Sequence, residues 1–284
     1  NGSSPTLINL VIKNSVSTGG EVSTFEDGVE VITIEGGGAN AALDSSNPPI
    51  TNIDFIDNIS EIGLGGALYL DSGSSPRITD CSFSNNVAMA TIGGSSGIDE
   101  TATIAGGAIY YGIDCDAFIT GSTFSGNSAY SMGGIVVPPD NDDPNDPNSP
   151  VDPGPVNGQT YTIGGAIYSE PNNVLNINRS TFTSHSGGVI YASSGIYTEP
   201  NLLDCIFTDN TAVADGAVLY VGQFGITEIK GCQFTGNSTS GSGGVLSVLG
   251  NINVKSSQFE DNIADGNGGA IDIYEPNGYV LQLT

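Results

Sequence analysis

Two short patterns recur together along this chain at a nearly constant spacing. A Phe-x-x-Asn tetrapeptide is followed by a glycine pair and two small or aliphatic residues, and three clean copies lie between Phe207 and Ile271. The phenylalanines of these copies, Phe207, Phe234 and Phe259, are roughly 25–28 residues apart, a period typical of solenoids. In such proteins each repeat stacks on its neighbours.

Each repeat is expected to contain two or three β-strands and no helix. Residues 217–220 and 270–273, which follow the glycine pairs, are rich in alternating small, β-branched and aromatic residues, as strands are. A second strand runs into the phenylalanine, as in residues 229–234, and no segment sustains the period of a helix. The chain is therefore predicted to be all-β, a right-handed single-stranded parallel β-helix with one coil per repeat.

The repeated side chains have a predicted place in this coil. Equivalent strands of successive coils lie about 4.8 Å apart, so the phenylalanines should stack inside the helix. The asparagines fall at a bend three residues later and should form an amide ladder. The predicted stack is Phe55, Phe83, Phe124, Phe182, Phe207, Phe234 and Phe259, and the predicted ladder is Asn58, Asn86, Asn127, Asn210, Asn237 and Asn262. His185 replaces the asparagine after Phe182, and we interpret it as a bend residue rather than a base.

The repeat predicts one domain over residues 1–284. Residues 1–54 are interpreted as worn first coils and residues 55–273 as clear repeats. The distance from the glycine pair to the next phenylalanine is steady in the first copies, whereas the distance from phenylalanine to glycine pair varies. Insertions at 89–105 and 131–162 should thus share one corner of the coil, which is often the binding face of a solenoid. The second is rich in Pro and Asp and is expected to be extended or disordered.

The tandem of Phe-x-x-Asn and Gly-Gly-Ala-Ile, as in residues 106–109 and 124–127, resembles the repeats of chlamydial polymorphic outer membrane proteins and related surface proteins. The resemblance covers roughly residues 55–273 and implies a right-handed parallel β-helix displayed outside the cell, as an adhesin or a surface scaffold. The sequence departs from the pattern at Asp215, which we align with a first glycine, and at Val189, Val245 and His185.

Charge narrows the range of partners. The chain has 5 Lys and Arg against 31 Asp and Glu, a net charge of −26, which excludes nucleic acids and anionic membranes as natural partners. No apolar run is long enough for a membrane helix. No cofactor is expected, but the charge suits a chain that meets cations, such as calcium or the ions of saline water. Candidate calcium ligands in the Pro-rich insertion are Asp140, Asp142, Asp143 and Asp146. The prolines between them stiffen this loop, and the alternative is a solvated acidic linker.

Four sequons bear on the compartment. The chain begins at Asn1 without a methionine, so we expect that a leader has been removed. Asn1, Asn58, Asn178 and Asn237 each begin an Asn-x-Ser/Thr sequence, a glycosylation signal in secreted proteins. Asn58 and Asn237 also belong to the predicted ladder, where an inward side chain would bar a glycan. We expect an extracellular or cell-surface protein.

The cysteines permit a disulfide. Cys81, Cys205 and Cys232 each lie two residues before a motif phenylalanine, and should point to the same side as its ring. Cys205 and Cys232 occupy matching places in successive coils, near enough to form a disulfide. The alternative is that they are small inward residues. Cys115 has no such register, and the absence of Cys-x-x-Cys argues against zinc.

A parallel β-helix is compatible with an enzyme, a structural scaffold or an adhesin. A polysaccharide lyase or hydrolase needs a basic residue beside carboxylates, but the cations Lys13, Arg77, Arg179, Lys230 and Lys255 have no acidic cluster in register. A non-enzyme is therefore predicted. The sequence favours an extracellular scaffold or filament subunit that stacks end to end or on continuing segments. The alternative is an adhesin whose corner loops bind a surface ligand or glycan.

Overall fold

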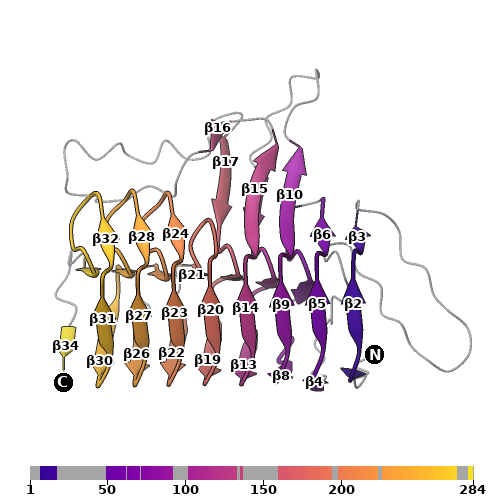
Figure 1. Cartoon of the computed structure of the whole chain (residues 1–284), viewed down its shortest axis with the longest axis horizontal. Helices are drawn as coiled ribbons and strands as arrows, with labels where there is room; N and C mark the ends of the chain where they lie inside the picture. The colour runs from indigo at the N-terminus through magenta and orange to yellow at the C-terminus, as the bar shows by residue number, and fades with distance from the viewer. Residues whose placement is uncertain are drawn as a thin grey trace, which may run out of the picture.

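The computed structural model describes residues 7–17, 49–61, 63–70, 72–91, 102–132, 135–136, 159–193, 198–222, 226–273 and 281–283. Within these ranges every regular element is a strand and every strand pair is parallel (Figure 1). All pairs join one coil to the next except β16 and β17, which both belong to the insertion after Phe124. The predicted parallel β-helix is confirmed.

Three long sheets form the walls of the helix, and each coil contributes one strand to each wall. Sheet A has nine strands: β1 (Leu7–Ile8), β4 (Pro49–Thr51), β8 (Arg77–Thr79), β13 (Asp116–Thr120), β19 (Val174–Asn178), β22 (Glu199–Leu203), β26 (Ile226–Lys230), β30 (Asn251–Lys255) and β34 (Leu281–Leu283). Sheet B has eight strands: β2 (Val11–Lys13), β5 (Asp54–Ile56), β9 (Ser82–Ser84), β14 (Thr123–Ser125), β20 (Thr181–Thr183), β23 (Ile206–Thr208), β27 (Gln233–Thr235) and β31 (Gln258–Glu260). Sheet C has seven strands: β7 (Leu68–Leu70), β12 (Ile109–Tyr111), β18 (Ile167–Ser169), β21 (Ile190–Ala192), β25 (Leu219–Val221), β29 (Leu246–Val248) and β33 (Ile271–Ile273).

Further strands, of two to five residues, lie at the corner between sheets B and C. One corner sheet contains β3 (Val16–Ser17), β6 (Ile59–Ser60), β10 (Val87–Thr91) and β15 (Ser128–Met132), and another contains β24 (Thr211–Ala212), β28 (Ser238–Thr239) and β32 (Ile263–Ala264). A further sheet contains β11 (Ala102–Ala105), β17 (Gln159–Ile163) and β16 (Ile135–Val136). In Figure 1, β10, β15, β16 and β17 extend beyond the walls, and with β11 we call them the projection.

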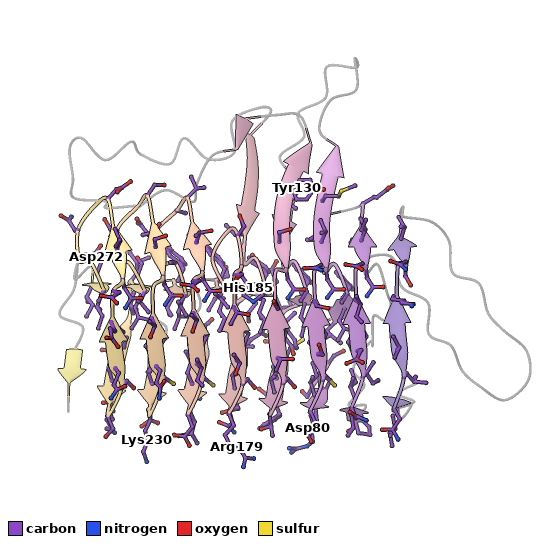
Figure 2. All side chains as sticks on the ribbon, viewed as in Figure 1. Asp80, Tyr130, Arg179, His185, Lys230 and Asp272 are labelled. Carbon is purple, nitrogen blue, oxygen red and sulfur yellow. The ribbon has the colours of Figure 1, made fainter. Side chains whose placement is uncertain are left out.

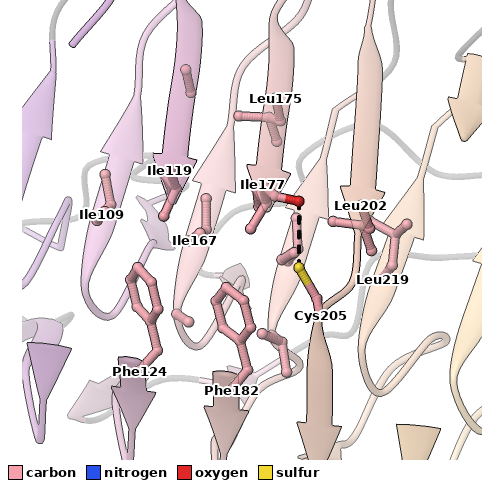
Figure 3. Packing of buried hydrophobic residues seen from close by; sticks show 14 of the residues in the cluster. Ile109, Ile119, Phe124, Ile167, Leu175, Ile177, Phe182, Leu202, Cys205 and Leu219 are labelled. Atoms are coloured by element: carbon pink, nitrogen blue, oxygen red, sulfur yellow. Dashed lines mark hydrogen bonds between the residues drawn. The ribbon is translucent and has the colours of Figure 1, made fainter. Parts of the chain in front are cut away.

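The phenylalanine stack runs through the interior as predicted. Phe124 pairs with Phe83 on one side and Phe182 on the other, and neighbouring ring centroids lie 4.6 Å apart in both pairs. The stack continues without interruption from Phe55 to Phe259. Isoleucines and leucines of sheets A and C surround these rings in one core (Figure 3). The core is therefore a column of identical contacts, one layer per coil.

The bends between walls explain the polar residues beside the phenylalanines. Asp80 and Asp57 turn the chain before and after sheet B with φ of 52° and 54°, and Gly121 and Gly126 do so in the Phe124 coil. Asn, Asp and Gly tolerate this left-handed conformation better than other residues. A bend on each side keeps sheet B strands three residues long, with the central phenylalanine pointing inward.

The glycine pair meets two different constraints. Gly106 has a φ of 67°. A Cβ on Gly107 would lie 2.1 Å from the carbonyl oxygen of Gly165 and 2.5 Å from the backbone nitrogen of Ser128. The first glycine thus supplies a left-handed bend, and the second allows the chain to pass against the corner strand.

One predicted alignment was wrong by a residue. Leu219 pairs with Leu246, so Gly216, with a φ of 71°, takes the first glycine's place instead of Asp215. Ala217 takes the place of the second glycine. The reason is steric. The left-handed bend lies at residue 216, where a Cβ would lie 2.6 Å from the Leu219 carbonyl oxygen, and Asp215 precedes this bend.

The two insertions do share one corner, as their spacing predicts. β10 and β15 lengthen the corner sheet in neighbouring coils and pair residue for residue. The chain returns through β11 and β17, which also pair. Ala88, Ile104 and Ala129 form a small buried cluster between the outgoing and returning strands. Residues 137–158, including the candidate calcium ligands, lie outside the described residues, as do residues 18–48.

The difference between core and bend should be measurable by substitution. Phe234→Ala removes a fully buried ring and should lower the free energy of unfolding by about 3–5 kcal/mol. Asn210→Ala removes an amide that bonds to Asn237 and to the Phe182 carbonyl, and should cost about 1–3 kcal/mol. Urea denaturation measures both. Equal effects near zero would show that neither side chain belongs to the core.

Candidate functional site

The asparagines at the B-to-corner bend form a buried hydrogen-bonded ladder. The backbone nitrogen and Nδ2 of Asn86 both donate to Oδ1 of Asn127, each over 2.9 Å. Nδ2 of Asn86 also donates to the Phe55 carbonyl over 3.0 Å. Asn210 and Asn237 repeat this arrangement. Each of these amides therefore satisfies backbone groups at the bend of the preceding coil and also bonds to the asparagine of the following coil.

His185 occupies the ladder position in the Phe182 coil. Its ring Nδ1 accepts the backbone N–H of Asn127 over 3.1 Å, and the backbone N–H of His185 donates to Oδ1 of Asn210 over 3.1 Å. Nε2 is buried with no hydrogen-bond partner in the described part of the chain. Burial lowers the pKa of His185 to about 4, against the opposing pull of the Asn127 and Phe124 carbonyls. At neutral pH this is an uncharged bend residue (Figure 2).

This histidine should make the fold sensitive to acid. Its pKa is lower in the folded chain than in the unfolded chain, so its contribution is complete above pH 6.5 and is lost as the pH falls towards 4. The loss should reach about 3 kcal/mol. His185→Asn restores the amide and should remove this loss, which urea denaturation at pH 7 and pH 4 would reveal. The carboxylates titrate in both proteins and cancel in the comparison. Identical pH dependence would contradict a buried neutral histidine.

The structure corrects the disulfide hypothesis for Cys205 and Cys232. All four cysteines are buried free thiols. The two thiols contact each other through a hydrogen bond, and each Sγ also lies against a backbone carbonyl, but no S–S bond joins them. Sγ of Cys205 lies 3.3 Å from the Ile177 carbonyl oxygen (Figure 3), and Sγ of Cys232 lies 3.5 Å from that of Leu202. The Cys232 thiol and burial raise the pKa of Cys205.

These thiols belong to a column of small residues that the sequence analysis overlooked. From the Phe83 coil to the Phe259 coil a Cys or Ser lies two residues before the phenylalanine, and its Sγ or Oγ can accept a backbone N–H of the preceding coil, as Ser122 does for Cys81 and Ser257 for Cys232. The column is Cys81, Ser122, Ser180, Cys205, Cys232 and Ser257. The recurring Cys or Ser before these six phenylalanines was the signal. The predicted inward, small-residue role is the one these cysteines have.

The ladder removes two of the glycosylation candidates. Asn58 and Asn237 are fully buried, and their amides are engaged in hydrogen bonds, so a glycan on either would break the ladder. Asn178 is partly exposed on β19, and Asn1 lies outside the described residues. Asn178 is the described sequon whose asparagine reaches the surface.

Glycosylation should therefore be selective. When the chain is secreted from a eukaryotic host, folded material should carry a glycan on Asn178 and none on Asn58 or Asn237. Peptide mass spectrometry after endoglycosidase treatment measures each site. Asn178→Gln should remove the mass shift at that site without changing thermal stability. Soluble protein glycosylated at Asn237 would contradict the buried ladder.

A stack of tyrosines runs outside sheet C, and the sequence analysis missed it. Rings of Tyr69, Tyr110, Tyr168, Tyr191 and Tyr220 follow one another with centroids 4.6–5.5 Å apart. Each tyrosine lies four residues after the first glycine of its coil's bend, and this constant spacing was the available signal.

The tyrosine stack is tucked against the base of the projection. Tyr110 and Tyr168 pack on Ala105 and Ile163, the residues just before two glycine pairs. The Tyr110 hydroxyl donates to Oε1 of Glu170 over 2.7 Å. Burial and this carboxylate raise the pKa of Tyr110. These rings brace the projection and are mostly covered.

The projection carries one large exposed aromatic residue among its described side chains. Tyr130 on β15 is 42% exposed (Figure 2). The corner predicted to be a binding face thus presents an aromatic side chain on a supported strand. Whether the calcium candidates Asp140, Asp142, Asp143 and Asp146 bind an ion stays a prediction.

Charged side chains on sheet A contact side chains of neighbouring strands in the same sheet. Lys255 pairs with Glu228 over 3.3 Å, where both side chains are exposed, and Arg77 lies 4.5 Å above the Phe118 ring. Among the described residues, no three His, Cys, Asp or Glu side chains gather as a metal site. No helix that could span a membrane occurs in the described ranges.

Comparison with known proteins supports the resemblance seen in the sequence. Residues 256–274 match the Chlamydia polymorphic membrane protein (Chlamydia_PMP) repeat. This segment contains Phe259, Asn262 and the pair Gly268–Gly269, the elements from which the resemblance was inferred. No curated protein matches the chain significantly, and neither does any solved structure.

Proposed function

We propose that this chain is a non-catalytic extracellular structural protein, a surface scaffold or filament subunit. The observation that carries the proposal is the last described coil. Among the described strands, β31 and β33 are the last of sheets B and C, and Phe259, Ile271 and Ile273 of this coil are only partly buried. A partly covered apolar layer whose strands have no further partner within the described residues favours pairing with another coil.

The hydrogen bonds of the asparagine ladder run in one direction, from each coil to the next. Where an asparagine follows an asparagine, as at Asn58 and Asn237, the first donates its backbone N–H and Nδ2–H to Oδ1 of the asparagine in the following coil. In the described part of the chain Asn262 receives such bonds from Asn237 and has no following asparagine. A further coil, from a neighbouring copy or a continuing segment, would extend both the stack and the ladder.

The surface setting is supported by the matched repeat and by the charge. The repeat is described for a family of membrane proteins, which favours a cell-surface location. The net charge of −26 opposes side-by-side clumping and leaves end contacts as the favoured mode of assembly.

An adhesin is the second candidate, and the projection favours it. Two neighbouring coils build one raised structure from paired strands, and Tyr130 is exposed on it. Exposed aromatic side chains are frequent anchors of protein interfaces. Tyr130→Ala should then lower attachment to a bound surface, whereas Ile113→Ala, at a similarly exposed position, should not.

Electron microscopy of the native assembly tests the scaffold. We expect continuous fibres that Ile271→Asp shortens or abolishes, because this places a charge on the apolar end face. Val213→Asp makes the same kind of change at a position that is 64% exposed on the side of the solenoid, and should leave fibres intact. Discrete rods from native material would overturn the filament.

The non-catalytic part needs a separate test. The chain should leave polyuronates and other acidic polysaccharides uncleaved with or without calcium. Release of unsaturated sugars, followed by ultraviolet absorbance, would overturn it.

A further inference from the structure

The outer face of sheet B carries a regular field of hydroxyl groups. In β9, β14, β20, β23 and β27 the central phenylalanine points inward, so the residues before and after it point outward. Eight of these outward residues are Ser or Thr: Ser82, Ser84, Thr123, Ser125, Thr181, Thr183, Thr208 and Thr235. The remaining outward residues of these strands are Ile206 and Gln233.

Strand register places the hydroxyls in two straight columns. Ser82 pairs with Thr123 and Thr123 with Thr181, which makes one column. Ser84, Ser125, Thr183, Thr208 and Thr235 pair in succession and make the other. The strands lie side by side in Figure 1 as one row of parallel arrows. The hydroxyls therefore form a two-dimensional array fixed by the backbone.

Nothing in the described part of the chain uses these hydroxyls. None of the eight side chains has a hydrogen bond within the described ranges, and none is among the residues with further contacts. In contrast, outward side chains of sheet A bond to each other, as Asn201 does to Asn176 and Lys255 to Glu228. The sheet B face is open to an outside partner.

The array is also free of charge. The described charges on the outer face of sheet B are Lys13, Asp54 and Glu260, which lie on the first two strands and the last. Other charged groups, such as Asp80 and Asp209, lie at the bends that border the face. The phenylalanines of these strands point into the core, so the field offers no ring on which a sugar could stack. An ionic or saccharide partner is disfavoured.

The spacing of the array points to an ordered lattice of water. Neighbouring hydroxyls of a column are about 4.8 Å apart, and the two columns are about 6.6–6.8 Å apart, since two residues separate them along the strand. Both distances are close to the principal repeats of hexagonal ice. Uncharged hydroxyls at these positions can hold water molecules where an ice surface needs them, and threonine methyl groups fill the spaces between. We propose that the outer face of sheet B, centred on Thr181 and Thr183, is an ice-binding surface.

The test is partition of the whole chain into a slowly growing ice front. Wild-type chain should enter the ice several-fold more than an inert protein of similar size, and should inhibit ice recrystallisation. Thr183→Lys and Thr181→Lys place a long charged side chain in the array and should abolish both effects.

Thr120→Lys is the matched control. Thr120 is a partly exposed threonine on the outer face of sheet A, and this variant should still enter the ice. Circular dichroism melting of all variants establishes that they are folded. Exclusion of the wild-type chain from ice would overturn the proposal, as would equal loss in Thr120→Lys. Retention on crystalline chitin or cellulose together with exclusion from ice would assign the face to a polysaccharide and overturn it as well. None of these results depends on fibre formation.

Discussion

The constraint on which this structure depends is the satisfaction of buried backbone groups at the bends of each coil. A chain that turns sharply while remaining buried leaves N–H and C=O groups without strand partners, and these are costly unless paired. The asparagine ladder pairs them. Asn127 donates through Nδ2 to the Phe83 carbonyl of one coil and receives two bonds from Asn86 through Oδ1. Because each bond joins neighbouring coils, the bend and the stacking of coils are one interaction.

The phenylalanine stack and the surfaces follow from that register. When the bends coincide from coil to coil, identical side chains fall above one another, and neighbouring rings of the Phe124 region meet at 4.6 Å inside the core. Outward residues fall into columns for the same reason, the tyrosines on sheet C and the hydroxyls on sheet B. A regular surface is thus a consequence of a regular interior.

This coupling explains how much the sequence could reveal. The stack at Phe234 and the bend at Asn210 were predictable because one sequence repeat corresponds to one coil of the β-helix. Asp215 was aligned wrongly because the sequence does not show which residue of this segment has a positive φ. The pairing of Leu219 with Leu246 shows that it is Gly216. The disulfide prediction was wrong although the two positions were correctly placed together, because spacing shows that Cys205 and Cys232 are close but does not show whether thiols in contact are joined by an S–S bond. The regular spacing of the tyrosines could be read from the sequence, but their partial burial could not. That burial depends on strands β11 and β17 of the projection, whose pairing joins segments separated by long insertions.

The Phe182 coil shows which parts of the repeat are indispensable. Its chain passes from His185 through Ser186 directly to Gly187 and Gly188, so the corner sheet is interrupted and only single bridges from Ser186 join its two parts. Sheets A, B and C nevertheless continue through this coil without a break. The ladder position is filled by a side chain that still accepts a backbone N–H, even though its second ring nitrogen is left without a partner in the described chain. A bend acceptor is therefore required in every coil, whereas the corner beyond it can lengthen into a projection or disappear. Variation at the corner can alter what the molecule binds there while the hydroxyl array on sheet B keeps its spacing.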